Sequence, residues 1–470
     1  MPPNGSRLLV TAPSSAVIRE PVSLLVEAVD ADGRTIPDFT GRVSLSATDP
    51  LARLPQPWEF YSIERGRRRF DGLVFRCEGV HTVSAVDEKH GLRGESAPVI
   101  VEVRRPKYRL YWGDLHGHSG AYACGEGTID AYYQFARDCV GLDFCALTDH
   151  DQLPGLSHGL SGTWPSIVEA ARYYHRPHEF ITFLGYEWTS MEAQRNGRGY
   201  GHKNVYYLED EGPLFTCVDP PSDHPDGLWK CLKGRAALVI PHHPATTRAW
   251  WTDWSYHNAE LERLVEIYSA WGSSECPASA GNPYPIRHGG GETPGRHVVD
   301  ALSRGYLLGF IGGGDTHDGC PGRGYAHAPR SEKEAKRWHG IYRAGLQAVY
   351  ARDLTRESLW KAMRVRRTYA TTGARIVLEF SVGSAPMGSL IKHWPGGAAR
   401  FHARVEGTAG IAWVELLRNG AVIERRPGRG RSLSFEWARN AQPGMAQSFY
   451  LRVIQVDGHM AWSSPIWLGE

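Results

Sequence analysis

The middle of the chain alternates short apolar runs with segments of helical period, and no hairpin signal separates them. The strand candidates are residues 110–118, 143–150, 180–188, 237–243, 264–271, 307–317 and 346–351. Because consecutive parallel strands need a crossover connection, this alternation predicts an α/β domain built from strand–helix units. Periodicity alone leaves open whether the strands close as a barrel or form an open, doubly wound sheet.

Two of the helices between these strands have clear signals. After Thr128, apolar residues recur at helical spacing on one face, as a helix that covers a parallel sheet requires: Ile129, Tyr133, Ala136 and Val140. Thr355 is the expected N-cap of a helix that runs through Trp360.

Both ends of the chain have a different texture, with short β-branched segments separated by turn residues. Residues 7–103 contain several such segments, which predict a β-sandwich. The end of the chain repeats this character and carries a hairpin signal at Asn419-Gly420. We therefore expect three domains: an Ig-like β-sandwich over residues 1–105, the central α/β domain over 106–373, and a second β-sandwich over 374–470.

Composition excludes several classes of function. The 470 residues are 41% hydrophobic and 22% charged, which indicates compact folding rather than disorder. The net charge is only +2 with the charges interspersed, so we expect a small-molecule partner rather than nucleic acid or a membrane. No apolar run approaches the ~20 residues of a membrane span, and the start lacks the layout of a signal peptide. These features favour a cytoplasmic protein, although removal of a signal would leave the same start; the oligomeric state is left open.

The eight cysteines are scattered along the chain and form no CxxC pair. This pattern indicates free thiols rather than a disulfide scaffold. Cys139 and Cys145 lie in apolar stretches, so we expect them to be small buried hydrophobic residues and not nucleophiles.

Histidine and carboxylate residues follow the expected strands. In GDLHGHS, His116 and His118 are two residues apart, so both imidazoles project to one face of an extended strand and can chelate one ion. GGGDTHDG gives Asp315 and His317 the same spacing, after glycines that permit close approach. Because active sites of parallel sheets lie at the carboxyl ends of the strands, all these residues should meet there. Other strand ends add Asp149, His150, Glu187 and His243.

Imidazole mixed with carboxylate is typical of zinc, manganese or iron sites, whereas calcium requires oxygen ligands almost exclusively. The candidate ligands are too many for one ion, so a carboxylate such as Glu187 can bridge two divalent ions. A hydroxide bridging the ions would be the nucleophile, because metals lower the pKa of bound water to about 7. The sequence therefore predicts a metal-dependent hydrolase.

The order of these motifs resembles a known family. HGH, LTDHD, the glutamate of GYEW, HHP and DTH are similar to the PHP (polymerase and histidinol phosphatase) superfamily. GDLHGHS, GLDFCALTDHD, GYEWTS and GGGDTHDGCPG resemble a PHP-like branch of unknown function, the DUF3604 type, over residues 108–373. The resemblance implies a distorted seven-stranded (β/α) barrel, here flanked by the two β-sandwiches, with two or three divalent ions (Zn, Mn or Fe) that serve phosphoester hydrolysis.

The resemblance also implies a set of ligands. By position, His116, His118, Glu187 and Asp315 match the ligands of one ion, Glu187, His202 and His243 those of a second, and His150 and His317 those of a third. The loop SGAYACGEG is longer than the usual turn after HxH, so the remaining ligand of the third ion is open. We expect Glu126 to be this ligand and Cys124 to be a packing residue. The alternative is a site that binds only two ions.

Further residues are candidates for catalysis or substrate binding. His242 is expected to contact substrate or protonate the leaving group, or else to make a supporting hydrogen bond. Asp149 is expected first to orient a ligand, with proton transfer from the attacking water as the alternative. Arg323 is expected to hold a phosphate oxygen, as are Lys203 and Arg248.

The run AWWTDWSY places Trp250, Trp251 and Trp254 close together. Such a cluster predicts either an aromatic wall for a substrate or packing between the central domain and a β-sandwich.

The leading functional prediction is a phosphoesterase that acts on a small anionic substrate. A hydrolase of carboxylic esters or amides is the first alternative, because the same cluster can promote attack on a carbonyl. The second is a carbohydrate- or protein-binding module with a non-catalytic metal site, which the intact set of candidate ligands disfavours.

Overall fold

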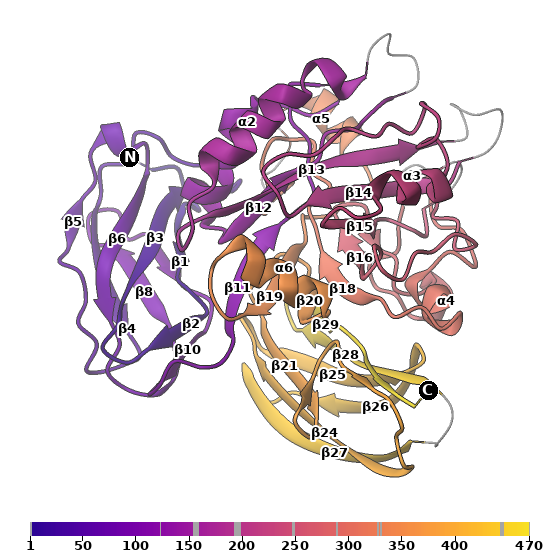
Figure 1. Ribbon diagram of the computed structural model, residues 1–470. Helices are drawn as coiled ribbons and strands as arrows, with labels where there is room; N and C mark the ends of the chain where they lie inside the picture. The colour runs from indigo at the N-terminus through magenta and orange to yellow at the C-terminus, as the bar shows by residue number, and fades with distance from the viewer. Residues whose placement is uncertain are drawn as a thin grey trace.

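The structure is a computed structural model that describes residues 2–122, 124–153, 159–191, 199–246, 250–287, 290–326, 329, 331–441 and 446–469. Figure 1 shows an N-terminal group of strands beside the central region, and a C-terminal group of strands below it. Arg248, a candidate anion-binding residue, lies outside the described residues.

The N-terminal region is built from three small sheets, ordered β1-β3-β6, β2-β10-β7 and β5-β4-β8-β9. Their strands are β1 (Arg7–Thr11), β2 (Ser15–Val17), β3 (Pro21–Val29), β4 (Arg42–Ala47), β5 (Trp58–Glu59), β6 (Arg67–Val74), β7 (Gly79–His81), β8 (Val83–Asp87), β9 (Arg93–Glu95) and β10 (Val99–Glu102). Alternate residues, such as Val26, Phe70 and Val83, fill one apolar core.

Each of the seven segments expected to be strands in the central region contains one. The elements are β11 (Arg109–Asp114), α1 (Ile129–Gln134), the π-helix η2 (Phe135–Val140), β12 (Phe144–Leu147), α2 (Trp164–Tyr174), β13 (Ile181–Ser190), β14 (Gly201–Tyr207), α3 (Pro225–Leu232), β15 (Ala237–Pro241), β16 (Leu264–Ser269), β17 (Gly272–Ser273), α4 (Val298–Ser303), β18 (Gly309–Gly312), α5 (Glu332–Arg337), β19 (Leu346–Ala351), α6 (Arg356–Arg364) and β20 (Thr368–Thr371).

The strand directions differ from the predicted barrel of parallel strands. β11, β12 and β13 are parallel, but β14 and β15 follow as antiparallel neighbours. β16 and β18 form a separate parallel pair, which meets the end of β11 through a bridge between Gly117 and Thr316. The other edge of β11 pairs antiparallel with β19. Among the described residues no continuous ladder closes these strands, so the seven-stranded (β/α) barrel is not confirmed.

β14 was not expected, and it explains much of this difference. It pairs with both β13 and β15 and is buried along its whole length. The sequence GHKNVYY contains polar residues, so it lacks the apolar run by which a buried strand is recognised. These polar residues can be buried because their interaction partners are distant in the sequence but close in the fold.

Both helix predictions are confirmed. Thr128 Oγ1 accepts a hydrogen bond from the Ala131 N–H at 3.1 Å at the start of α1. Thr355 Oγ1 accepts one from the Ser358 N–H at 3.2 Å at the start of α6. Each cap satisfies a backbone donor that the first helical turn leaves free.

The C-terminal strands continue the central sheet. β20 pairs with β29, and the order β20-β29-β28-β25-β26 extends the ladder that begins at β15. A second sheet has the order β22-β21-β24-β27. The strands are β21 (Val377–Val382), β22 (Ala385–Pro386), β23 (Leu390–Ile391), β24 (Gly397–Glu406), β25 (Ile411–Arg418), β26 (Ala421–Pro427), β27 (Ser432–Ala441), β28 (Gln447–Gln455), β29 (Met460–Ser463) and β30 (Ile466–Leu468). The expected domain boundary at residue 373 therefore falls within a region that one sheet spans.

All eight cysteines are free thiols, and Cys139 and Cys145 are buried as predicted. Among the described residues, no helix has the length and apolar character that crossing a membrane would require.

Candidate metal centre

The carboxyl ends of the central strands bring the candidate ligands together. His116 and His118 follow β11, His150 follows β12, and Asp315 follows β18; all four are buried. β13 and β14 contribute buried side chains from within the strand, and the end of β15 contributes two adjacent histidines: Glu187, His202, His242 and His243. The expectation that these residues share one edge of the fold is met.

Glu187 lies at the centre of the cluster. Its Oε1 is 2.8 Å from His202 Nδ1 and 3.2 Å from His150 Nδ1. Its Oε2 is 3.3 Å from His118 Nε2 and 3.5 Å from His116 Nε2. Each carboxylate oxygen thus faces a different set of imidazoles, which is the arrangement that a carboxylate bridging two ions requires.

Asp315 completes the first group. Its Oδ1 lies 3.3 Å from His118 Nε2 and 3.5 Å from His116 Nε2. The ligand atoms of His116, His118, Glu187 and Asp315 all lie within 4.8 Å of one another. Buried atoms in this group have no hydrogen-bond partner among the described residues: His116 Nε2, Glu187 Oε2 and Asp315 Oδ2. Unsatisfied buried acceptors that converge on one point fit a cation.

His202, His242 and His243 form a second group within the same 4.8 Å limit. His242 Nε2 lies 3.5 Å from Glu187 Oε1, and neither of its ring nitrogens has a hydrogen-bond partner in the described structure. Burial, together with the neighbouring His202, lowers the pKa of His243 to about 3. The neutral imidazole that results is the form that binds metal. His242, expected to contact substrate, thus lies among candidate ligands.

The third group consists of His118, His150 and His317. Cys124 faces this group: burial raises the pKa of its thiol, but His150 and His317 outweigh burial and lower the pKa to about 6. The Glu126 carboxylate instead pairs with Arg337 at 3.3 Å. The structure therefore places Cys124 beside the two histidines and Glu126 in an ion pair with Arg337.

The two central carboxylates are held in their ionised form. Burial raises the pKa of Glu187, but His150 and His242 outweigh it and hold the pKa well below its usual range. Burial acts on Asp315 in the same way, and His116 holds its pKa well below the usual range. Ionised carboxylates are the form that ligates metal ions.

Two carboxylates that sequence reasoning missed support His116. Glu266 in β16 accepts from His116 Nδ1 at 3.0 Å, which turns Nε2 toward Glu187 and Asp315. Asp114 accepts from the N–H groups of His116 and Gly314 at 3.1 and 2.8 Å and so joins the ends of β11 and β18. Glu266 could have been noticed as the charged residue within the otherwise mostly apolar run LVEIYSAW.

The glycines before Asp315 have a steric reason. A Cβ at Gly313 would lie 2.0 Å from Glu266 Oε2, so only glycine lets this carboxylate reach His116. Asp315 and His243 both have positive φ, at 47° and 30°. Non-glycine residues in this region are strained, and such strain is concentrated at functional sites.

Asp149 supports the loop that follows the HxH motif. Its carboxylate accepts from the Ser119 N–H at 2.7 Å and from the Ser119 Oγ–H at 2.8 Å. Burial raises its pKa to about 7 against the lowering effect of these bonds. This position agrees with the first-ranked expectation, a residue that orients the ligand loop.

Two of the expected anion-binding residues point elsewhere. Arg323 Nη1 pairs with Glu27 Oε2 at 2.6 Å, and Nη2 donates to the carbonyl of Cys139. The expectation for Arg323 is therefore wrong, because its guanidinium joins the central region to the N-terminal sheet. Lys203 is also misassigned: it alternates with His202 on β14, and its Nζ pairs with buried Glu262 at 2.7 Å.

Trp250 fits the predicted aromatic wall, whereas Trp254 fits the alternative prediction of packing. The Trp250 ring lies 6.3 Å from His202 and 5.7 Å from Trp271, which in turn lies 5.4 Å from His243. These half-buried rings form an aromatic wall beside the second group. Trp254 is fully buried and packs in the core, as the alternative interpretation had it.

Comparison with known proteins agrees with the motifs. Residues 156–281 and 301–389 match the family "Protein of unknown function (DUF3604)", which confirms the resemblance to the DUF3604 type over the central part of the chain. Uncharacterised proteins of Chlamydia muridarum and Chlamydia trachomatis serovar D are each 30% identical to it over 430 residues, 87% of this chain and 65% of the relative. The chain thus spans 65% of the length of the curated relatives it matches.

Among solved structures, the crystal structure of a "two-domain protein containing predicted PHP-like metal-dependent phosphoesterase" from Bacteroides vulgatus has a TM-score of 0.37 and 13% identity. The match covers 77% of this chain and 98% of that one.

Proposed function

We propose that this chain is a metal-dependent hydrolase, and that its substrate is a phosphoester. The observation that carries the proposal is the buried Glu187 carboxylate, whose two oxygens face different sets of histidines, with unpartnered ligand atoms around it. Such a concentration of unsatisfied acceptors would be costly without bound cations.

The candidate ligands can be assigned to three ions. His116, His118, Glu187 and Asp315 would hold one ion, and His202, His242 and His243 a second beside the same glutamate. His150, His317 and Cys124 would hold a third. When bound, such ions lower the pKa of water to about 7 and neutralise charge on a phosphoryl oxygen.

The residues around the ligands keep this geometry fixed. Glu266 orients His116, Asp149 holds the loop at Ser119, and neither needs to change its contacts during a reaction. Trp250 and Trp271 restrict access of water beside the second group and offer an apolar face to the organic part of a small anionic substrate.

Phosphorus is preferred over a carbonyl because a cluster of this size can neutralise the several charges of a phosphoryl group, and because the motifs resemble the PHP superfamily. A carboxylic ester or amide is the alternative substrate. Two measurements separate them: metal analysis of the purified protein, and hydrolysis of chromogenic phosphate mono- and diesters and of acyl esters with added manganese, zinc or iron.

We expect two to three ions per chain and metal-dependent turnover of a phosphate ester. Bound metal with turnover of acyl esters alone would refute the phosphoester assignment. No tightly bound metal under any loading condition would refute the proposed function itself.

Substitution of a metal-ligand residue should abolish metal binding and turnover together. In Asp315→Ala and His118→Ala we expect loss of bound metal and of turnover, with the fold retained by circular dichroism. Cys139→Ala is the control and should change neither, because its thiol lies in the interface with the N-terminal sheet. Full activity in either ligand variant would contradict the proposal.

A further inference from the structure

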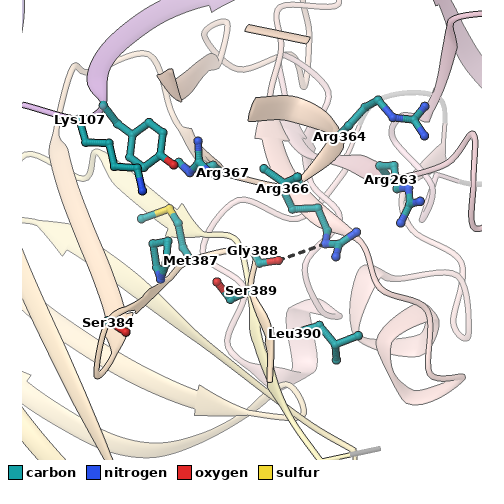
Figure 2. A pocket seen from close by; sticks show the side chains of 13 residues that line it. Lys107, Arg263, Arg364, Arg366, Arg367, Ser384, Met387, Gly388, Ser389 and Leu390 are labelled. Atoms are coloured by element: carbon teal, nitrogen blue, oxygen red, sulfur yellow. Dashed lines mark hydrogen bonds between the residues drawn. The ribbon is translucent and has the colours of Figure 1, made fainter. Parts of the chain in front are cut away.

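A cavity of about 750 Å³ lies at the amino ends of β16 and β18, whereas the metal centre lies at their carboxyl ends (Figure 2). Arg263 directly precedes β16, and Arg366 packs against Gly309 at the start of β18. Lys107, Arg364 and Arg367 also line the cavity, with the loop of residues 384–390 as its other wall. Figure 2 labels all five basic side chains among the residues that line the cavity.

The basic side chains of the cavity lack ion-pair partners in the described part of the chain, although Glu260 acts on the charge of Arg263 without pairing with it. Within the described ranges, no carboxylate forms an ion pair with any of these five basic residues. Arg366 is only 7% exposed, yet its Nη1 has no hydrogen-bond partner among the described residues, and its Nε donates to the Gly388 carbonyl at 3.3 Å. The Nε atoms of Arg263 and Arg367 are likewise buried without a partner in this part of the chain.

Keeping these groups together is unfavourable for the folded protein. Burial and the nearby charge of Arg263 lower the pKa of Arg366 to about 10, and burial and Arg364 lower the pKa of Arg263. Arg366 also has a positive φ of 59°, and a Cβ at position 309 would lie 2.7 Å from its Cβ. Unpaired buried charge and strained backbone are retained mainly where a ligand compensates for them.

We propose that this cavity is a binding site, separate from the metal centre, for a small molecule that carries two or more linked phosphate groups. Guanidinium groups bind phosphate oxygens through paired N–H donors, and Ser384 and Ser389 in the opposite wall add hydroxyls. A single carboxylate would leave most of the five charges uncompensated, whereas a diphosphate matches them. The chain has a net charge of only +2 with no basic stripe outside this cavity in its sequence pattern, which disfavours nucleic acid and membranes.

The test is calorimetric titration of the full-length protein with inorganic diphosphate. Arg263→Ala/Arg364→Ala should weaken this binding about tenfold or more, because charge-assisted hydrogen bonds are lost. Both side chains are partly exposed, so the fold should tolerate the change. Arg93→Ala, an equal loss of charge per residue on exposed β9, is the control and should leave binding unchanged.

Diphosphate bound at the metal centre is separated by Asp315→Ala, which should lose only the metal-dependent portion of the heat. ADP titrated in parallel shows whether the cavity also takes the nucleoside: tighter binding than diphosphate, sensitive to the double variant, extends the proposal to nucleotides. Diphosphate affinity that is unchanged when Arg263→Ala/Arg364→Ala is combined with Asp315→Ala, or binding that disappears entirely in Asp315→Ala alone, would overturn it. Since metal content and turnover are measured separately, failure here leaves the proposed hydrolase function intact.

Discussion

Glu266 shows how one side chain outside the ligand set can control a metal centre. It contacts His116 at Nδ1 and leaves Nε2 free to face Glu187 and Asp315. We expect Glu266→Gln to weaken metal binding by about 10–100-fold, because a neutral acceptor orients and polarises the imidazole less. Competition with a chelating dye measures the change, with exposed Glu59→Gln as the control. Unchanged affinity in Glu266→Gln would contradict this role.

Arg323 is expected to act on stability and not on catalysis. Arg323→Met leaves the buried Glu27 without its cationic partner, so the free energy of unfolding should fall by about 3 kcal/mol. Thermal melting measures the loss, and KM for the best chromogenic ester should stay unchanged. A large rise in KM without loss of stability would restore the anion-binding interpretation.

Asp49 should give the N-terminal region an acid-sensitive contact. Burial raises its pKa, but the N–H groups of Arg76, Cys77 and Leu51 outweigh burial and lower the pKa from 3.8 to about 2. A lowered pKa stabilises the folded state above the ordinary value, and this stabilisation is lost as the pH falls toward 2. Asp49→Asn should therefore be less stable than the parent protein at pH 5, with the difference in melting temperature shrinking toward pH 2. A difference independent of pH would be contrary to this account.

Some residues of the site could be predicted from the sequence and others could not. His116 and His118 could be found because a two-residue spacing on an extended chain fixes their common face, and Asp315 and His317 because the same spacing recurs at another strand end. The role of Glu266 could not be predicted, since it depends on how the separate β16–β18 pair packs against the end of β11, and that is decided by tertiary packing. The direction of the Arg323 side chain was unpredictable for the same reason.

Substitutions of two adjacent residues of β14 should affect different properties, one the metal content and the other the stability. His202 faces Glu187, and Lys203 points to the other face, where it pairs with Glu262. We expect His202→Ala to lower the metal content while the fold is kept. Lys203→Met should leave Glu262 uncompensated and lower the melting temperature, with metal content per folded chain unchanged. Metal analysis and thermal melting of both variants check the pair; equal effects of the two substitutions on metal would contradict the alternation.

At the scale of elements, strands with apolar runs were predictable and their directions were not. β12 and β18 stand out because buried parallel strands are continuously apolar. β14 carries polar residues on both faces, so its hydrophobic pattern is weak although every residue is buried. β19 reads like the other strands but runs antiparallel to β11, since pairing direction depends on the connection and leaves no mark in the strand's own residues.

At the scale of the whole molecule, the sheet that runs from β15 to β26 joins the central and C-terminal regions. A buried polar network crosses the same junction: Glu275 accepts from Arg452 Nη1 at 3.0 Å, from the Tyr450 hydroxyl at 2.8 Å and from Trp462 Nε1 at 2.8 Å. Glu275 precedes the expected boundary at residue 373 and its three donors follow it. Neither part can satisfy these groups alone, so the central and C-terminal regions should unfold together.

Arg452→Met tests this coupling in the full-length protein. The substitution leaves the carboxylates of Glu275 and Glu415 buried without their shared cation, so we expect a loss of about 3–5 kcal/mol. Calorimetry should show the transition of the central and C-terminal regions move to lower temperature as one unit. Arg439→Met is the control, because its pair with Glu424 lies near the surface and is worth about 0–1 kcal/mol. If the C-terminal transition alone shifted, and metal stayed bound above it, the two regions would be independent and the boundary at residue 373 would mark a true domain junction.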